Sequence, residues 1–288
     1  MTIIASALML VMAISCTKPD NTGNDDEQPP HLTPPSEDVE VEVSYDKGEG
    51  VIRLLSYNVG AFSKEKASSI AMIARLIKEL DADIVGMNEV DSCTTRTGKV
   101  YQAKSLADML GWHHYYGRAM SYQGGAYGNA IVMSKDFQNK GHDLITIPKG
   151  SGSEQRSCAV MKNEKFVYMA THLDVKNEES RLSGVRLITD WAKKNYGDSD
   201  TPVFLCGDMN CEPNDAPIKL LQQDWTLLSV TKNTYSAISP KKCIDFIFVY
   251  NNKAKYEKVA SDVPTVFKEA DVTVASDHLP VYVDVKLK

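Results

Sequence analysis

The residues of this sequence that could do chemistry are polar side chains set directly beside apolar, strand-like runs. Burying such a side chain without a partner is costly, so each one needs a reason for its position. The set comprises Asn58, Glu89, His172, Asp208, Asn210, Asp277 and His278. Because α/β proteins bind ligands where strand ends present side chains from rigid elements, we expect this set to converge in one cleft.

Asp245 strengthens this expectation, since the segment "CIDFIFVY" surrounds its carboxylate with apolar residues. A buried carboxylate needs a partner, and the imidazolium of His278 is the natural candidate. Such pairing would fix the tautomer of His278 and raise its pKa, which suits a group that holds or protonates an anion. Taken singly, the others have ordinary alternatives: "GDMN" is also a turn sequence, Asn58 could cap a turn, Glu89 could be solvated and His172 could lie hydrogen-bonded at a sheet rim.

This donor set predicts a hard divalent cation as cofactor. Carboxylates and an amide, without a Cys–His cluster, suit Mg²⁺ or Mn²⁺ rather than zinc, and the sequence has no CxxC pair. Such an ion polarises a phosphoryl oxygen or stabilises a leaving oxygen. A carboxylate to orient water, histidines for phosphate charge and one or two hard metal ions together point to phosphoester hydrolysis.

The elements that must position these residues alternate along the chain from residue 51 onward, with no internal repeat. Apolar runs predict strands over 51–57, 83–89, 127–134, 155–161, 165–173, 201–210, 241–250 and 279–287, and helical spacing predicts helices over 70–80, 101–110, 178–194 and 215–223. Strands outnumber helices and several follow one another directly. This order favours a mixed sheet, or a pair of sheets, flanked by helices.

Seven motifs, in order along the chain, resemble those of the endonuclease/exonuclease/phosphatase superfamily, which has the DNase-I-like fold. They are "SYNVG", "NEV", "YGNAIVMS", "THLDV", "GDMN", "IDFIF" and "SDHLPV". The resemblance covers residues 51 to 286 and differs at "NEV", where "QEV" is more frequent. It implies an α/β fold, a four-layer α/β sandwich in which two facing mixed β-sheets are flanked by helices.

The resemblance also implies roles for the polar set. On the metal side, Glu89 is the principal ligand, with Asn58 beside it and Asp277 completing the site. Tyr127, Asn129 and Arg156 match positions near the family's cleft and are candidates for substrate binding. Packing within a sheet, or a surface cation in the case of arginine, would explain these last three equally well.

On the phosphate side, the resemblance implies that Asp208 orients or deprotonates the attacking water. Asn210 would bind the scissile phosphate and position Asp208, and His172 would donate a hydrogen bond to the phosphate as charge develops on its oxygens. His278 would do the same or act as general acid, oriented by Asp245. The expected activity is therefore a metal-dependent phosphodiesterase or phosphatase.

The substrate stays open, because nucleases, lipid phosphodiesterases and phosphomonoesterases share this catalytic set. Basic residues with interleaved aromatics would favour a nuclease; the candidates are Arg96, Lys99, Lys104, Tyr122 and Tyr127, which could equally form a solvated face. A sphingomyelinase-like lipid phosphodiesterase, a phosphomonoesterase acting on inositol or sugar phosphates, and an inactive envelope binding protein are the alternatives. The intact polar set argues against the last.

The first 50 residues differ in composition from the remainder. Residues 3–14, "IIASALMLVMAI", are too short to span a bilayer and are typical of a signal peptide core. The following "AISC" resembles a lipobox, which predicts a signal peptide over 1–16, lipidation at Cys16 and a lipid anchor in the bacterial cell envelope. A secreted or periplasmic protein is the alternative.

Residues 17–50 hold ten Asp/Glu against two Lys and are rich in proline, which is typical of a disordered tether. Residues 51–288 form the predicted catalytic domain and contain 30 Lys/Arg and 28 Asp/Glu. Because that balance is nearly neutral, it neither demands a polyanionic partner nor repels one. We expect a monomer.

Overall fold

The computed structural model describes residues 44–64 and 68–288. The signal peptide and lipidation site predicted over 1–16 lie outside the described residues, as does the tether up to residue 43. Within the described part of the chain, no helix combines the length and apolar character needed to cross a membrane.

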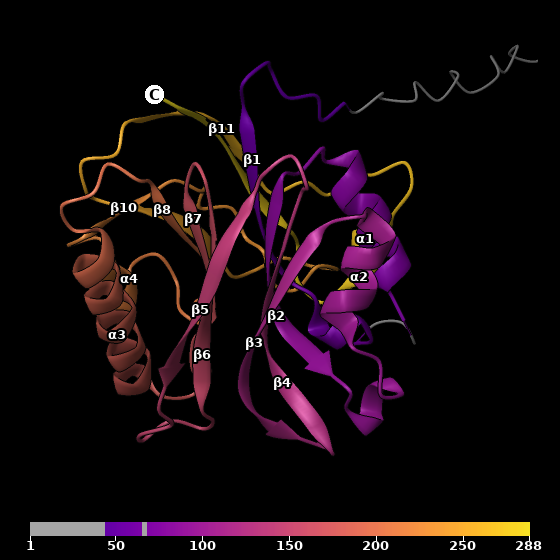
Figure 1. Cartoon of the computed structure of the whole chain (residues 1–288). Coiled ribbons are helices and arrows are strands. Elements are labelled where there is room, and N and C mark those ends of the chain that lie inside the picture. Colours follow the sequence, from indigo (N-terminus) through magenta and orange to yellow (C-terminus); the bar gives the residue numbers. More distant parts are fainter. Residues whose placement is uncertain (1–43, 65–67) are drawn as a thin grey trace, which may run out of the picture. The chain divides into compact units, whose positions relative to one another are not determined.

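Two mixed sheets of six strands each form the centre of the part of the chain that follows residue 51 (Figure 1). The first sheet has the order β11 (Tyr256–Asp262), β12 (Val281–Leu287), β1 (Ile52–Asn58), β2 (Ile84–Ser92), β4 (Gly125–Met133) and β3 (His113–Tyr122). The second has the order β5 (Asn139–Ile147), β6 (Arg156–Asn163), β7 (Val167–His172), β8 (Val203–Asp208), β10 (Asp245–Tyr250) and β9 (Trp225–Leu227). Neighbours pair antiparallel except β1 with β2 and β7 with β8.

Helices cover the outer face of each sheet. α1 (Ile70–Glu79) and α2 (Gln102–Leu110) pack on the first sheet, and α3 (Glu178–Tyr196) and α4 (Ala216–Leu221) on the second (Figure 1). The short helix α5 (Val272–Ala275) precedes β12. The arrangement is the four-layer sandwich predicted from the sequence, and the prediction is confirmed.

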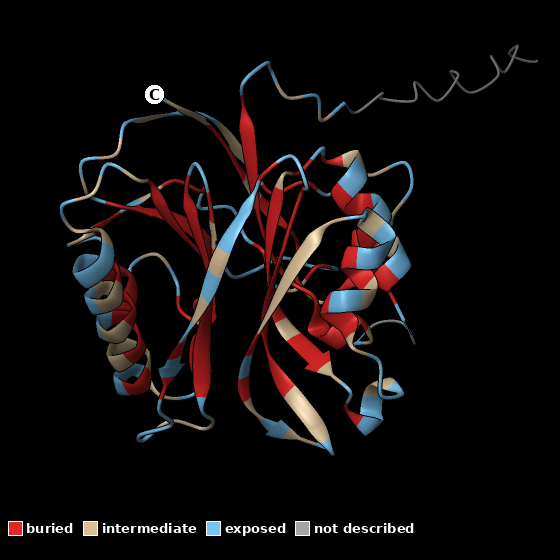
Figure 2. Ribbon diagram, in the orientation of Figure 1, coloured by how far each residue is buried: buried red, intermediate tan, exposed pale blue. Residues whose placement is uncertain are grey.

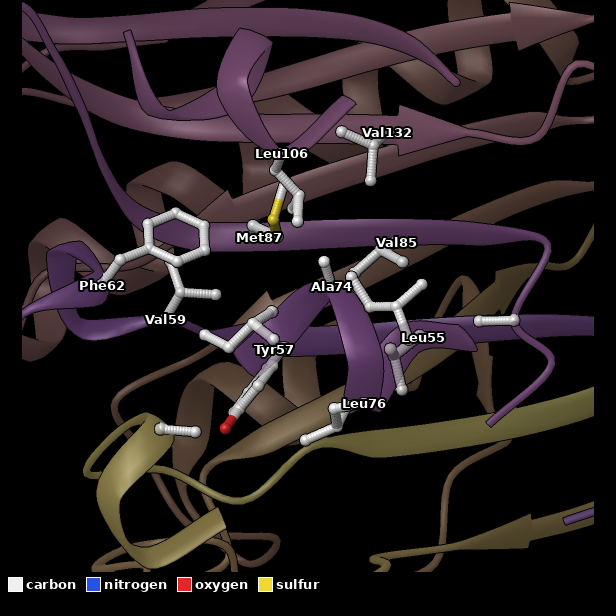
Figure 3. Close-up of a cluster of buried hydrophobic side chains, with 14 of the residues drawn as sticks. Leu55, Tyr57, Val59, Phe62, Ala74, Leu76, Val85, Met87, Leu106 and Val132 are labelled. Carbon is white, nitrogen blue, oxygen red and sulfur yellow. The ribbon is translucent and has the colours of Figure 1, made fainter. Parts of the chain in front are cut away.

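Three apolar clusters separate the four layers. One joins α1 and α2 to the first sheet, where Leu55 and Val85 meet Leu76 (Figure 3); a second joins α3 and α4 to the second sheet; the third fills the space between the sheets. Neighbouring residues of one strand serve different clusters, since Leu55 faces the helices while Leu54 faces the other sheet. Central strands are therefore apolar on both faces, which explains their uninterrupted apolar runs.

The two sheets approach closely at Gly86 of β2. A Cβ atom at this position would lie 2.1 Å from Sγ of Cys206 on β8, so only glycine fits. The two sheets can approach this closely here because glycine has no side chain.

All the predicted strands and helices are present, and four strands are additional: β3, β5, β9 and β11. β3, β5 and β11 are half-exposed or edge strands, and Figure 2 shows β5 largely exposed. Edge strands are more exposed than central strands and carry more polar residues, so their apolar pattern is weaker.

The topology brings the polar strand ends to one end of the sandwich. β1 ends at Asn58, and Glu89 follows its pairing partner Asn88 on the parallel strand β2. β7 and β8 are parallel and end with His172 and Asp208. β10 runs antiparallel to β8 and begins at Asp245, directly opposite Asp208. β12 runs antiparallel to β1, so the segment before it, with Asp277 and His278, lies at this same end.

Candidate active site

A cleft of about 530 Å³ opens at this end of the sandwich. Six residues of the predicted polar set line it: Glu89, His172, Asp208, Asn210, Asp277 and His278. Asn58 and Asp245 are fully buried and contact the lining residues from below. The structure therefore brings together the seven members of the set and Asp245.

A β-bulge aims Glu89 into the cleft. Two residues of β2, Asn88 and Glu89, lie opposite the single residue Asn129 of β4, and Glu89 has a φ of 55°. Bulges re-aim side chains at the cost of local pairing, and a left-handed backbone at a non-glycine residue is strained. Asn210, at the other side of the cleft, has a φ of 50°. Glu89 and Asn210 thus both have a left-handed backbone, and both line the cleft.

Asn88, the residue that replaces the more frequent glutamine, ties the two sheets together beneath the cleft. Its Nδ2 donates to Oδ1 of Asn129 at 2.9 Å and to the carbonyl of Thr171 at 2.8 Å. Its Oδ1 accepts from the backbone N–H of Asp208 at 2.9 Å. Asn129, predicted as a candidate for substrate binding, is thus buried in this network and is not among the described residues that line the cleft.

Glu89 and Asp277 form the side of the cleft predicted to hold a metal ion. The ammonium of Lys64 bridges them, 3.1 Å from Oε1 of Glu89 and 2.9 Å from Oδ2 of Asp277. Oδ1 of Asp277 is buried and has no hydrogen-bond partner within the described residues. Two carboxylates, one with an unsatisfied buried oxygen, fit a hard divalent cation.

Asn58 turns its amide nitrogen toward this centre. Nδ2 donates to Glu89 at 3.2 Å and to Asp208 at 3.0 Å, while Oδ1 accepts from the backbone N–H of Gly60 at 3.1 Å. In this arrangement Asn58 joins the two carboxylates as a donor. Its coordination of a metal ion stays a prediction.

A second group of ligands lies beside the first. Asp208, Asp245 and His278 offer ligand atoms within 4.8 Å of one another. The number of ions, one or two, and their identity, Mg²⁺ or Mn²⁺, stay predictions.

His278 is paired with Asp245, as the sequence predicted. Nδ1 lies 2.9 Å from Oδ2 of Asp245, which also accepts from the hydroxyl of Thr234 at 2.6 Å. Burial lowers the pKa of His278, but the charges of Asp245 and Asp208 outweigh it and raise the pKa to about 9. The imidazole is therefore protonated at neutral pH, with Nε2 directed to Asp208 at 3.6 Å.

His172 has the opposite character. Burial, with the nearby Arg156 charge, lowers its pKa to about 3. Nδ1 lies 3.3 Å from a guanidinium nitrogen of Arg156, and Nε2 lies 2.8 Å from Nδ2 of Asn210. The two histidines therefore differ in pKa, and the predicted hydrogen bond from His172 to the phosphate stays a prediction.

Asp208 is held between these histidines. Its Oδ1 accepts from the backbone N–H of Asn210 at 2.9 Å, and its Oδ2 lies 3.5 Å from Nε2 of His172. Burial raises the pKa of this carboxyl, and the neighbouring charge of Asp245 adds to the effect. The result is a fixed carboxylate with increased proton affinity.

Two predicted substrate-binding residues line the cleft: Tyr127 and Arg156. Arg156 is 4% exposed, and its Nε has no hydrogen-bond partner within the described residues. An unsatisfied buried donor at a cleft wall suits an anionic ligand.

The sequence analysis missed several residues of the site: Lys64, Thr234, Tyr235, Lys242 and Ser276. Ser276 stands in the quoted motif "SDHLPV", and its hydroxyl donates to the carbonyl of Asn58 at 2.6 Å. Thr234 and Lys64 stand in segments without any pattern that points to the site. Only contacts made by the folded chain reveal them.

Comparison with family models shows to which protein family the chain belongs. The model of the endonuclease/exonuclease/phosphatase family matches residues 55–278. The chain belongs to this family. The resemblance drawn from the seven motifs is thereby confirmed, and a comparison with curated proteins finds no match.

Solved structures of the endonuclease/exonuclease/phosphatase family share the fold. A family protein from Bacteroides thetaiotaomicron has a TM-score of 0.66 at 18% identity, covering 83% of this chain and 98% of that one. A mannosyl-6-phosphatase from the same organism has a TM-score of 0.62 at 19% identity, covering 81% and 99%. ANGEL2, a 2',3'-cyclic phosphatase, has a TM-score of 0.64 at 14% identity, covering 82% and 95%. Relatives with this fold are thus hydrolases of phosphate esters.

Proposed function

We propose that the protein is a divalent-metal-dependent phosphoester hydrolase. One observation carries the proposal: the Glu89–Asp277 pair, with an unsatisfied buried oxygen, lies in the same cleft as the protonated His278 and the fixed carboxylate of Asp208. A metal ion bound by Glu89 and Asp277 would polarise the phosphoryl oxygen. The remaining groups supply the other requirements of the reaction.

Asp208 is the group that orients the attacking water. Its carboxylate is fixed by the Asn210 backbone and by Asn58, and its raised pKa favours acceptance of a proton from that water.

Three groups bind the phosphate and its developing charge. His278 donates from Nε2 as an imidazolium, Arg156 offers its free Nε, and Asn210 offers its amide. Donors that are fixed before the reaction stabilise charge that appears in the transition state, since they need no reorganisation. Asp245 and Thr234 hold His278 in the required tautomer and orientation.

A colorimetric assay tests this proposal. We expect the purified protein to release nitrophenol from bis-(p-nitrophenyl) phosphate or p-nitrophenyl phosphate when Mg²⁺ or Mn²⁺ is present, and to lose this activity in EDTA. Release that is equal with and without EDTA would remove the metal from the proposal. No release from either ester would favour the alternative of an inactive envelope binding protein.

We also propose a cellular location for the protein, which the sequence before residue 51 supports. Lipidation at Cys16 would anchor it in the bacterial cell envelope, and an unlipidated secreted or periplasmic form is the alternative. Incorporation of labelled palmitate that is abolished by Cys16→Ala is the expected result. Labelling that survives this substitution would refute the anchor.

A further inference from the structure

The charges that line the cleft are predominantly negative. Besides Glu89, Asp208 and Asp277, the lining includes the carboxylates of Glu154, Glu212 and Asp215. They are opposed by three basic side chains, Lys64, Arg156 and Lys242, and by His278. With one divalent ion bound the lining is close to neutral, so it provides no net attraction for a polyanion.

Two of the three basic residues that would have favoured a nuclease, Arg96 and Lys104, are engaged elsewhere. Arg96 forms two hydrogen bonds with the buried Asp91, at 2.7 and 2.8 Å, and stacks over the ring of Tyr122 at 4.7 Å. Lys104 pairs with Asp108 at 2.6 Å. Neutralised cations of this kind contribute little to phosphate-backbone binding, which depends on releasing counterions from free charges.

Two carboxylates beside the phosphate-binding residues remain free of ion pairs. Glu212 and Asp215 are exposed and follow Asn210 on the loop between β8 and α4. Neither carboxylate has a cationic partner among the residues that the structure describes. The backbone N–H of Glu212 donates to Oδ2 of Asp215 at 2.7 Å, which holds the loop in a tight turn at the edge of the cleft. Carboxylates in this setting are acceptors for hydroxyl groups.

The residues around the cleft complement these acceptors. Lys242 is exposed and supplies a donor, and Tyr235, which is 36% exposed, presents a ring that packs against His278 with 4.9 Å between centroids. Apolar ring faces suit the C–H face of a compact cyclic group, while the carboxylates and the ammonium suit its hydroxyls. A cleft of about 530 Å³ admits a ligand of that size.

We infer that the substrate is a phosphate monoester of a small, uncharged polyol such as a hexose, with its hydroxyls held by Glu212, Asp215 and Lys242 and its phosphate by Asn210 and Arg156. This inference rests on the proposed function, since it names the group attached to the phosphate that this site hydrolyses. Nucleic acid and phospholipid would present further negative charge or long apolar chains to a compact acidic cleft.

A substrate panel tests the inference. The purified protein with Mg²⁺ is given hexose 6-phosphates, p-nitrophenyl phosphate, bis-(p-nitrophenyl) phosphate, an oligonucleotide and sphingomyelin vesicles, and kcat/KM is measured for each. We expect a hexose phosphate to exceed the oligonucleotide and sphingomyelin by at least about a hundredfold. Hydrolysis of nitrophenyl esters with a preference for oligonucleotide or lipid would overturn the inference and leave the proposed function standing. Inactivity toward every ester would overturn both.

A pair of variants tests the residues named. Glu212→Gln keeps the shape of an exposed side chain and removes its charge, so we expect the ratio of kcat/KM for the hexose phosphate to that for p-nitrophenyl phosphate to fall about tenfold, mainly through KM. Glu257→Gln is the matched control, because Glu257 is an exposed glutamate on β11 that does not line the cleft. An unchanged ratio in Glu212→Gln, or an equal fall in both variants, would overturn the assignment.

Discussion

The two sides of the cleft hold their polar groups in different ways. On the first sheet's side, the side chains of Glu89 and Asp277 are 15% and 17% exposed, and the charged partner of both is Lys64, which is 37% exposed. On the second sheet's side, His172 and Asp208 are 8% and 3% exposed and are fixed by amide and backbone groups. The groups of the first side are partly exposed and ion-paired, and those of the second are buried and held by hydrogen bonds.

This difference implies that the first sheet's side can exchange its bound cation, whereas the groups on the second sheet's side keep their positions. A partly exposed ion pair contributes about 0–1 kcal/mol, so a lysine can leave two carboxylates at little cost when another cation arrives. Removing one partner of a buried pair costs about 3–5 kcal/mol, because a buried charge is left alone. We interpret the first side as suited to cation binding and the second as suited to unchanging geometry around the phosphate.

We expect the largest effect from a substitution of Asp208, on the second sheet's side of the cleft. Asp208→Asn keeps the hydrogen-bonding shape but removes the group that accepts the proton, so we expect kcat to fall by about 10³-fold. Turnover of bis-(p-nitrophenyl) phosphate measures the change, and the thermal midpoint serves as control and should move little. A variant that retains a tenth of the activity would show that this carboxylate does not act on the water.

A substitution of His278 tests whether the charge of its imidazolium stabilises the buried groups around Asp245. His278→Ala should lower kcat by about 10²-fold, and it should also lower the thermal midpoint, because Asp245 then lies buried without its imidazolium. Adding Asp245→Asn in the same chain should restore the midpoint without restoring kcat. Recovery of activity in the double variant would contradict the role given to His278.

A substitution of Lys64 tests whether this lysine and a metal ion compete for Glu89 and Asp277. Lys64→Met removes the cation that bridges Glu89 and Asp277, so we expect Mg²⁺ or Mn²⁺ to bind about tenfold more tightly in the absence of substrate. Titration calorimetry measures this without reference to activity. Lys286→Met, on β12 and outside the cleft lining, is the control and should leave the affinity unchanged. Equal affinities in wild type and Lys64→Met would mean that Lys64 and the ion do not compete.

Asp174 gives the smallest effect. It accepts hydrogen bonds from the backbone N–H groups of Ser153, Lys176 and Asn177, each at 2.7–2.9 Å, and so anchors the loop that leads to Arg156. Although burial opposes it, the hydrogen bond from the Ser153 hydroxyl at 2.7 Å, together with these backbone donors, lowers the pKa of Asp174 from 3.8 to about 2. Asp174→Asn should lower the free energy of unfolding by about 1–2 kcal/mol at neutral pH.

The pH dependence of that loss follows from the direction of the shift. Because the folded pKa lies below the unfolded one, the carboxylate contributes its stability above pH 3.8 and loses it as the pH falls toward 2. Denaturant unfolding of both proteins between pH 7 and pH 3 checks this. A difference that grows on acidification would contradict the assignment.

Much of the fold was predictable because the central strands bury both faces. Runs such as "VFLCG" must lie inside a sandwich, and the polar residue that ends each run must therefore lie at its edge. β5 and β11 escaped prediction because edge strands obtain their conformation from backbone pairing with a neighbour rather than from an apolar pattern of their own.

The sequence by itself determined which groups could do chemistry, and it determined the pairing of Asp245 with His278, because a carboxylate within an apolar strand must find a cation. Only the tertiary structure decided the protonation of the two histidines, the bulge that directs Glu89, the burial of Asn129 and the position of Lys64 between two carboxylates. These depend on distances between segments far apart in the chain. Local sequence sets the conformation and apolarity of each element, whereas charge and hydrogen bonding are set by whatever the other elements bring within about 4 Å.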